Sequence, residues 1–489
     1  MDYSERGSGR DRVVIIGAGL TGLAAAHRLI GRSADVRRPL DVVVLEAKDR
    51  VGGAVWTDRV DGFTIEGGAD SFITNKPWAL NLCRELGLGD QLISTDDRNR
   101  RSFVVRRGKL QPVPEGFVLM APSRLLPLLS SPILSARGKL RMLMDLVLPR
   151  KSDDADESLA AFVRRRLGRE ALDRLVQPLV GGIYTADPAE LSLQATLPQF
   201  PAMEREHGSL ILGAIRQAKK SRTAERGNSG ARYGLFASLA DGMDALPNAL
   251  LGALPPRTVR TGTAVRRISR ADPSKPWKVE LLDGPPIEAG GVILTTEAHA
   301  SARLLDGVDP ELALQLRAIP YASSSIVTVA YRKDRIAHPL DGFGVVVPSA
   351  EGRSILAASF LSVKFPTRAP AGTALIRAFV GGATQPGLFD LDDEELKALV
   401  RSELGSLLGA SGEPILMGVA RHARAMPQYT LGHLDRVEAI RARAARHSRL
   451  HLAGNAFHGV GIPDCIRSGQ EAASDLIAAL ADPAAPVAA

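Results

Sequence analysis

The feature that most constrains this chain is a glycine-rich turn near its N-terminus, Gly17-Ala18-Gly19-Leu20-Thr21-Gly22. The apolar run 12–16 before the turn predicts a buried strand, and the alanine-rich stretch 23–30 after it predicts a helix. A second apolar run, 41–46, would complete a βαβ unit. In that setting the glycines permit a tight turn, a close approach of a pyrophosphate to the backbone, and close packing of helix on strand. The sequence therefore predicts a Rossmann-like dinucleotide site in preference to a purely structural turn.

A carboxylate and a second glycine pair bear on which dinucleotide binds there. Glu46 ends the second expected strand, where its carboxylate could accept hydrogen bonds from a ribose diol and would repel a 2′-phosphate. NADP is therefore disfavoured, whereas NAD and FAD remain. Gly52 and Gly53 would allow a second close approach to the backbone, and Arg50 could contact a phosphate. The alternative is that Arg50 is a solvated loop cation.

Composition excludes several other classes of protein. The 489 residues are 45% hydrophobic and 24% charged, which is typical of a globular chain with several domains. The net charge of +8 would suit nucleic acid, an acidic membrane surface or a small anionic substrate, but 4% aromatic residues provide little base stacking. Two cysteines, Cys83 and Cys465, exclude a disulfide framework and a cysteine-rich zinc site, and we expect no metal. Without a signal peptide or a run of ~18 apolar residues, a soluble or peripheral protein in a reducing compartment is predicted.

The rest of the chain alternates between helical and strand-like texture. Residues 117–148 and 158–180 predict a mostly helical insertion. We expect a leader at 1–10, a linker at 221–231 and a frayed tail from Ala481. Strands are expected at 257–268, 277–282, 291–295, 325–331, 343–347, 354–360 and 374–380. An acidic start predicts a helix from about 392 to 408, and 450–480 predicts a strand, a glycine-rich turn and a helix.

Two distant segments carry a resemblance to a known superfamily. The arrangement Glu46-x-x-x-Arg50-x-Gly52-Gly53 resembles the FAD-containing amine oxidase and phytoene desaturase superfamily. The segment 452–464 precedes an expected helix, and Pro463 suits a first helical turn. In flavoproteins of this type, such a helix points its positive end at the flavin pyrimidine, where the reduced flavin carries negative charge. The resemblance therefore favours FAD over NAD.

Further motifs narrow the resemblance to the oxygen-dependent protoporphyrinogen and coproporphyrinogen III oxidases. They follow the family order along the chain and comprise 66–72, 178–184, 191–193, Gly342-Phe343-Gly344 with Val347-Pro348, 426–429 and 454–465. The segment Gly182-Ile183-Tyr184, the pair Gln199-Phe200 and the soluble character are most similar to the coproporphyrinogen III oxidase branch. Two rivals remain: another flavin amine oxidase or desaturase of the superfamily, and a non-catalytic flavin-binding interaction protein.

The resemblance implies an α/β fold, α+β overall, with a Rossmann-like FAD-binding domain made of discontinuous segments. Those segments are 11–95, 216–300 and 431–481. A helical domain would occupy 96–215, where membrane-associated relatives have their membrane face. A substrate-binding domain with a β-sheet would occupy 301–430.

The resemblance also assigns site residues. The FAD-binding set is Gly17, Ala18, Gly19, Leu20, Thr21, Gly22, Glu46, Ala47, Arg50, Gly52, Gly53, Ala54, Gly68, Ala69, Asp70, Ser71, Val265, Val460, Gly461 and Ile462. The substrate-binding set is Arg101, for a propionate, with Gly182, Phe343, Val346 and Phe379 around the tetrapyrrole. The alternatives are that the two phenylalanines belong to a strand core and that Arg101 is a surface residue.

The implied chemistry is oxidation of a porphyrinogen to the porphyrin in heme biosynthesis. Flavin N5 would accept a hydride in each of three two-electron steps and dioxygen would reoxidise the flavin, giving hydrogen peroxide, so no catalytic side chain is expected. One noncovalent FAD is expected, because Cys465 is a poor attachment point. The expected partners are the porphyrinogen, dioxygen and heme-pathway enzymes, and no nucleic acid is expected. We expect the protein in the cytoplasm, with peripheral contact to the inner face of the membrane.

Two histidines and three basic runs need interpretation. His422 stands where the family often has Trp, and we interpret it and His458 as polar packing residues rather than bases. The basic runs 100–101, 106–109 and 164–166 are typical of solvated faces, with a secondary role in attracting the carboxylates of the substrate.

Overall fold

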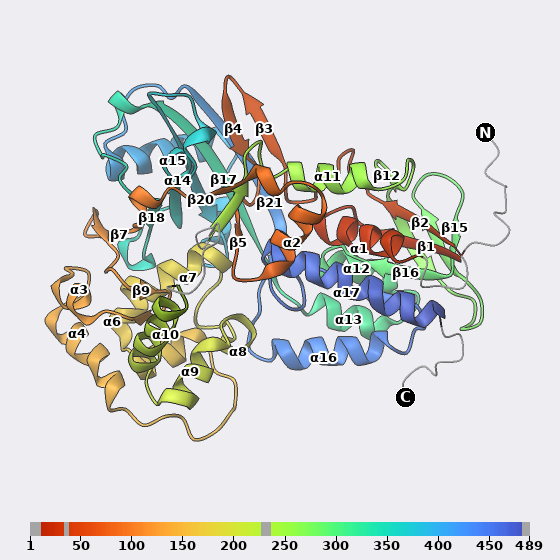
Figure 1. Cartoon of the computed structure of the whole chain (residues 1–489), viewed down its shortest axis with the longest axis horizontal. Coiled ribbons are helices and arrows are strands. Elements are labelled where there is room, and N and C mark those ends of the chain that lie inside the picture. The colour runs from red at the N-terminus through yellow and green to blue at the C-terminus, as the bar shows by residue number, and fades with distance from the viewer. Residues whose placement is uncertain (1–10, 34–38, 226–235, 482–489) are drawn as a thin grey trace.

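The computed structural model describes residues 11–33, 39–225 and 236–481. The expected leader 1–10, residues 226–231 of the expected linker and the tail beyond Ala481 lie outside the described residues. In Figure 1 the N-terminal βαβ unit and the C-terminal helix share the right-hand part of the molecule, and the left-hand part holds a large sheet above a group of helices.

A five-stranded parallel sheet forms the frame of the right-hand part. Its strand order is β12 (Val259–Arg260), β2 (Leu40–Leu45), β1 (Asp11–Ile16), β16 (Gly291–Leu294) and β22 (Leu450–Leu452). Residues Val13 to Ile16 are all buried, as expected for a parallel strand covered on both faces. The sheet therefore draws its strands from three separated parts of the sequence, and the predicted βαβ unit is present.

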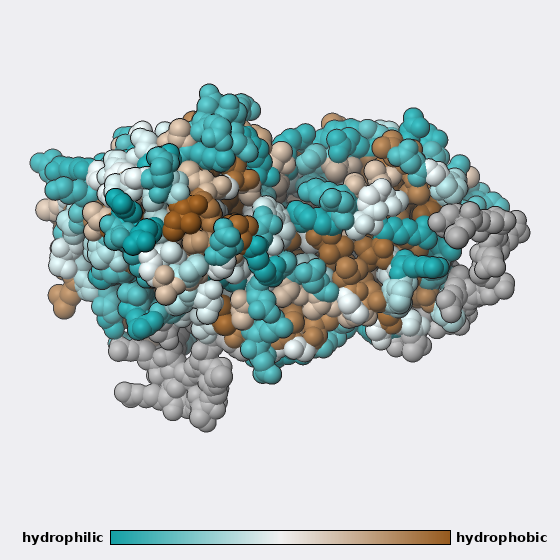
Figure 2. All heavy atoms as spheres, turned by 90° about the horizontal axis from the view of Figure 1, so that it is seen from above, coloured by the Kyte–Doolittle hydropathy of each residue, from teal (hydrophilic) through white to brown (hydrophobic). Residues whose placement is uncertain are grey.

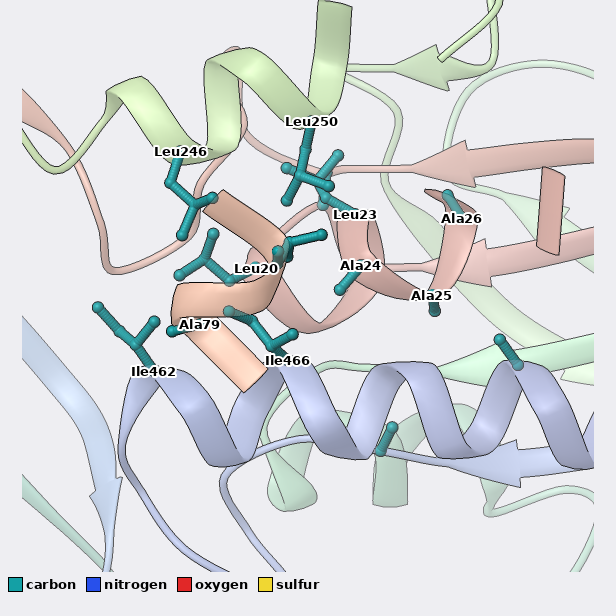
Figure 3. Close-up of a cluster of buried hydrophobic side chains, with 14 of the residues drawn as sticks. Leu20, Leu23, Ala24, Ala25, Ala26, Ala79, Leu246, Leu250, Ile462 and Ile466 are labelled. Carbon is teal, nitrogen blue, oxygen red and sulfur yellow. The ribbon is translucent and has the colours of Figure 1, made fainter. Parts of the chain in front are cut away.

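Helices cover both faces of this sheet. One face packs against α1 (Leu20–Gly31), α2 (Pro77–Glu85), α11 (Ala245–Ala253) and α17 (Ile462–Ala481). Figure 3 shows Leu20, Ala79, Leu246 and Ile462 converging between these helices. The other face packs against α12 (Ala298–Leu305), α13 (Pro310–Arg317) and α16 (His433–Ala444), and against a small sheet of β13 (Val265–Ser269), β14 (Trp277–Leu281) and β15 (Ile287–Ala289). In Figure 2 apolar atoms gather on the upper face where Figure 1 places α11, whose Leu251 is 39% exposed.

Short antiparallel strands connect the two parts. β3 (Thr57–Val60) and β4 (Phe63–Glu66) form a hairpin. β11 (Phe236–Leu239) lies between β5 (Phe72–Ile73) and β6 (Leu92–Ser94). The expected strand 257–268 is divided into β12 and β13, because Gly262 turns the chain with a φ of +60°.

A seven-stranded sheet forms the upper left part. Its order is β21 (Leu416–Pro427), β17 (Tyr321–Arg332), β20 (Thr373–Gly381), β19 (Ala357–Phe360), β18 (Gly344–Val346), β7 (Phe103–Arg106) and β8 (Lys109–Pro112). One face packs against α15 (Asp393–Leu408), which begins at a capping box formed by Asp392 and Glu395. A single helical turn, α14 (Leu361–Lys364), follows β19. Strands β7 and β8 precede the helices of the segment 96–215 and complete this sheet.

The lower left part is mostly helical, as predicted. Its helices are α3 (Leu125–Ser130), α4 (Ala136–Leu143), α5 (Leu159–Arg166), α6 (Arg169–Ala171), α7 (Gln177–Tyr184), α8 (Leu193–Thr196), α9 (Gln199–His207) and α10 (Leu210–Glu225). A π-helical stretch, Leu172–Val176, leads into α7, and the strands β9 (Phe117–Val118) and β10 (Ala121–Pro122) pair beside them. Helix α10 includes residues 221–225, for which the sequence predicts a linker. Among the described residues, no helix is long and apolar enough to cross a bilayer.

Candidate active site

The glycine-rich turn lies between the carboxyl end of β1 and the N-terminus of α1. Gly17 has a φ of +106°, and a Cβ on Gly22 would lie 1.9 Å from the carbonyl oxygen of Gly17. Neither position therefore tolerates a side chain. Helix α1 has no side-chain cap at Gly19 and no acidic residue in its first turn. Its N-terminal amides are thus available to an anion such as a pyrophosphate.

The second glycine pair lies directly against this turn. The amide of Gly52 donates to the carbonyl of Ala18 at 2.8 Å, and a Cβ on Gly53 would lie 3.2 Å from the Cα of Gly19. The two glycine segments therefore meet backbone to backbone, in the arrangement expected for a second close approach. The guanidinium of Arg50 is half-buried and lies 5.7 Å from the ring centre of Trp56.

Glu46 connects the glycine-rich turn with the segment that leads to Val265, a residue of the predicted FAD-binding set. Its carboxylate accepts hydrogen bonds from the amides of Ala18, at 2.7 Å, and Lys48, at 3.0 Å. The amide of Thr263 donates to the carbonyl of Glu46 at 2.7 Å, so the chain leading to Val265 lies beside the carboxylate. A carboxylate has lone pairs beyond those two bonds, which leaves it able to accept from a ribose hydroxyl.

The loop 66–71 packs against the second glycine segment at Ala54. A Cβ on Gly68 would lie 1.8 Å from the carbonyl oxygen of Ala54, and a Cβ on Gly67 would overlap the ring of Trp56. The loop is therefore packed against the residues that follow the second glycine pair. Asp70 accepts hydrogen bonds from Lys364 and Arg377, at 2.8 and 3.0 Å.

Tyr429 holds the C-terminal glycine-rich turn. Its hydroxyl donates to the carbonyl of Asn455 at 2.5 Å and accepts from the amide of Gly459 at 2.9 Å. Its ring stacks on His433 with centres 4.0 Å apart. Because Tyr429 is 1% exposed and follows β21, it fixes the position of residues 460–462 relative to the seven-stranded sheet.

Two of the predicted substrate residues, Val346 and Phe379, share one face of the seven-stranded sheet. Val346 pairs with Ala357, Ala357 with Phe379, and Phe379 with Ile326. Directly paired residues present their side chains on the same face, so Val346 and Phe379 lie on either side of a small alanine. The next pairs along the strands bring Gly344, Ser359, Arg377 and Thr328 to this face. Small residues therefore line the centre of this sheet face, and the side chains of Phe379 and Val346 stand on either side of them. Such a surface suits a flat ligand.

The other two predicted substrate segments lie close to that face. A Cβ on Gly182 would lie 3.8 Å from Cγ1 of Val346, so α7 approaches this sheet face at a residue without a side chain. The amide of Phe343 donates to the carbonyl of Arg101 at 2.8 Å. The guanidinium of Arg101 is paired with the carboxylate of Asp341, so a propionate would have to compete with or share that partner.

Comparison with known proteins identifies the family. Residues 20–477 match the family model described as flavin containing amine oxidoreductase. The chain is 35% identical to the coproporphyrinogen III oxidase of Bacillus subtilis (strain 168), over 96% of this chain and 98% of that protein. It is 37% identical to the coproporphyrinogen III oxidase of Propionibacterium freudenreichii subsp. freudenreichii, over 97% and 92%. A crystal structure from Exiguobacterium sp. 255-15 superposes with a TM-score of 0.84 at 32% identity, over 96% and 99%.

The chain belongs to the flavin-containing amine oxidoreductase family. The predicted family and fold class are thereby confirmed, and the cofactor is a flavin. The residues present fit such a cofactor, because the N-terminus of α1 is uncapped and two glycine segments abut beside it, where Gly19 and Gly53 leave the backbone bare.

Within this flavin-containing amine oxidoreductase, His422 supports the loop 66–71. Its Nε2 lies 2.8 Å from the carbonyl of Gly67 and therefore donates to it. Burial lowers the pKa of His422, and the nearby Arg377 adds to that effect against the opposing hydrogen bond. A neutral histidine that holds a loop agrees with its interpretation as a polar packing residue. The Nε2 of His458 is buried and has no hydrogen-bond partner within the part of the chain that the structure describes, and burial lowers its pKa as well.

Sequence reasoning missed the charged residues that hold the loop 66–71 from β20 and from the segment after β19. Arg377, Lys364 and Arg368 carry no local motif, and their partners in the loop lie 294 to 309 residues away in the chain. It also treated the run 164–166 as a solvated face, which is wrong for Arg166, whose side chain is 0% exposed. The helical spacing of Phe162, Val163 and Arg166 was the available signal, because it places Arg166 on the buried stripe.

An open cavity of about 550 Å³ lies between the start of β17, the end of β20 and the turn after α7. Its lining includes Asp187, Glu190 and Asp390 and no lysine or arginine. A ligand with several carboxylates would be repelled there, and none of the predicted substrate residues lines it.

Proposed function

We propose that this protein oxidises a porphyrinogen to the porphyrin, with coproporphyrinogen III as the preferred substrate. The observation that carries the proposal is the pairing of a dinucleotide cradle with a flat sheet face on which Val346 and Phe379 flank Ala357. The coproporphyrinogen III oxidases that the chain resembles over nearly their whole length support the choice of substrate. Protoporphyrinogen IX is the second candidate.

We further propose one noncovalent FAD, reoxidised by dioxygen. Bound FAD would supply the hydride acceptor for three two-electron oxidations, each returning one hydrogen peroxide. The protein's own contribution is to position the macrocycle on the sheet face and to exclude water. Cys465 is an unsuitable attachment point, because burial raises the pKa of its thiol to about 12 and keeps it protonated.

The test is anaerobic and aerobic turnover of the purified holoprotein with each porphyrinogen. We expect porphyrin fluorescence to appear with three molecules of hydrogen peroxide per porphyrin, and a higher kcat/KM for coproporphyrinogen III. Acid precipitation should release all the flavin as FAD. A flavin-loaded protein that yields porphyrin from neither substrate would contradict the proposal, and an amine or carotenoid precursor that is oxidised instead would favour the first rival.

We also propose that the protein works in the cytoplasm with peripheral contact to the membrane, where it would meet other heme-pathway enzymes. Leu126, Leu140 and Val147 project from the helical part, with exposures of 80%, 67% and 80%. Sedimentation with anionic vesicles tests this contact: wild-type protein should bind, and a variant with these three residues changed to Ser should not. Equal sedimentation of the two proteins would exclude this surface.

A further inference from the structure

A network of five charged side chains lies between the loop 66–71 and the seven-stranded sheet. Asp70 pairs with Lys364 and Arg377, and Glu66 pairs with Arg368 at 3.1 Å. The side chains of Glu66, Arg368 and Arg377 are 0 to 1% exposed, and those of Asp70 and Lys364 are 11% and 12% exposed. The network is therefore shielded from solvent, where charges interact more strongly than they do at a surface.

The network carries one net positive charge, from three cations and two carboxylates. Burial opposes the ionisation of Asp70, but Lys364 and Arg377 outweigh burial and hold its pKa well below the ordinary value. Burial raises the pKa of Glu66 against the opposing effect of Arg368. A proton on Glu66 would only increase the positive excess. Arg59 pairs with Asp244, and Asp241 lies near both Arg59 and Arg368, so the positive excess resides in Asp70 with Lys364 and Arg377.

The positive excess faces the predicted cofactor loop and the substrate face. Arg377 donates to the carbonyl of Gly68, and its guanidinium carbon lies 5.5 Å from the ring centre of Phe379. The Nε atoms of Arg377 and Arg368 are buried and have no hydrogen-bond partner among the described residues. Each of these two buried guanidinium groups therefore pairs with a carboxylate but keeps one N–H without an acceptor there.

We propose that this network raises the reduction potential of the flavin, with Lys364 and Arg377 as the residues responsible. The inference rests on the proposed function only in placing the flavin against the loop 68–71. Two electrons and one proton convert the neutral oxidised flavin into an anion, and a fixed positive charge in a shielded site stabilises that anion more than the neutral form. Hydride transfer from the substrate becomes more favourable as a result.

The experiment measures the flavin reduction potential by anaerobic equilibration with a reference dye. Lys364→Gln removes a cation and should lower the equilibrium constant for two-electron reduction about tenfold, which corresponds to about 30 mV. Asp70→Asn removes an anion and should raise the potential by a similar amount. Lys397→Gln is the matched control, because Lys397 pairs with Glu394 on α15, which packs on the other face of the sheet. The flavin in this variant should have the same reduction potential as in the wild-type protein.

Opposite shifts in Lys364→Gln and Asp70→Asn support the proposal, because damage to the fold would move both variants in the same direction. Unchanged potentials, or shifts of the same sign, would overturn it. Arg377→Gln provides a second loss of charge if Lys364→Gln loses flavin, and Arg377→Lys should restore the potential. A wild-type protein that holds flavin but makes no porphyrin would contradict the proposed function without affecting these potentials.

Discussion

A Cβ on Gly469 would lie 2.1 Å from the carbonyl oxygen of Thr21, so helices α17 and α1 meet backbone to backbone. This contact joins the two ends of the chain beside the glycine-rich turn. It explains how a helix near residue 470 can hold a turn near residue 20 in place. Both helices contribute side chains to the apolar cluster in Figure 3, together with α2 and α11.

Gly469→Ala should therefore lower the free energy of unfolding by about 3 kcal/mol, because the added methyl forces the two backbones apart. Flavin retention should fall with it, since the N-terminus of α1 would move. Gly252→Ala is the control: Gly252 lies in α11, where an added methyl would have no atom within 4 Å, so the change should stabilise by about 0.5–1 kcal/mol. Chemical denaturation gives the free energy of unfolding of both variants and of the wild type. A Gly469→Ala variant as stable as Gly252→Ala would contradict the close contact between α17 and α1.

The local parts of this fold were predictable because their signals are local. The glycine turn, the buried strands beside it and the acid-capped α15 each follow from a few consecutive residues. The motif at 426–429 was also recognised, although its sequence alone does not tell that Tyr429 bridges Asn455 and Gly459.

The charged contacts between the two parts were not predictable, for a physical reason. Arg377 and Asp70 are 307 residues apart, and only the completed fold brings them together. An ion pair carries no periodicity, so neither residue differs in the sequence from a solvated one. The pairing of Arg101 with Asp341, 240 residues away, escaped prediction in the same way.

The buried arginine of the helical part gives a second prediction. Arg166 donates to the carboxylate of Asp145 at 2.7 Å and to the carbonyl of Gly208 at 2.7 Å. Arg166→Met should lower the free energy of unfolding by about 3–5 kcal/mol, because it leaves the carboxylate of Asp145 buried without its counter-ion. Arg164→Met, at an exposed position two residues earlier, should change stability by less than about 0.5 kcal/mol. Thermal unfolding distinguishes the two, and a mild effect at Arg166 would refute its role as a buried anchor.

Acid should weaken the site through His433. Burial lowers the pKa of His433 to about 4, against an ordinary value near 6.5. The unfolded chain therefore takes up the proton first, and stability present above pH 6.5 is lost as the pH falls toward 4, by about 3 kcal/mol. His433→Phe keeps a ring against Tyr429 but cannot titrate. Its free energy of unfolding should fall less steeply over that range, and parallel pH profiles for the two proteins would exclude His433 as the cause.

Gly182→Leu should separate substrate binding from flavin binding. A Cβ at this position already comes within 3.8 Å of Val346, so a leucine would fill the space above the sheet face. Turnover of coproporphyrinogen III should fall at least tenfold, while the flavin absorbance spectrum and the melting temperature stay close to wild type, because Gly182 is exposed and remote from the glycine cradle. Ile183→Leu is the matched control, because it changes the adjacent exposed residue without adding volume. If Gly182→Leu retained full turnover, the macrocycle could not lie between α7 and Val346.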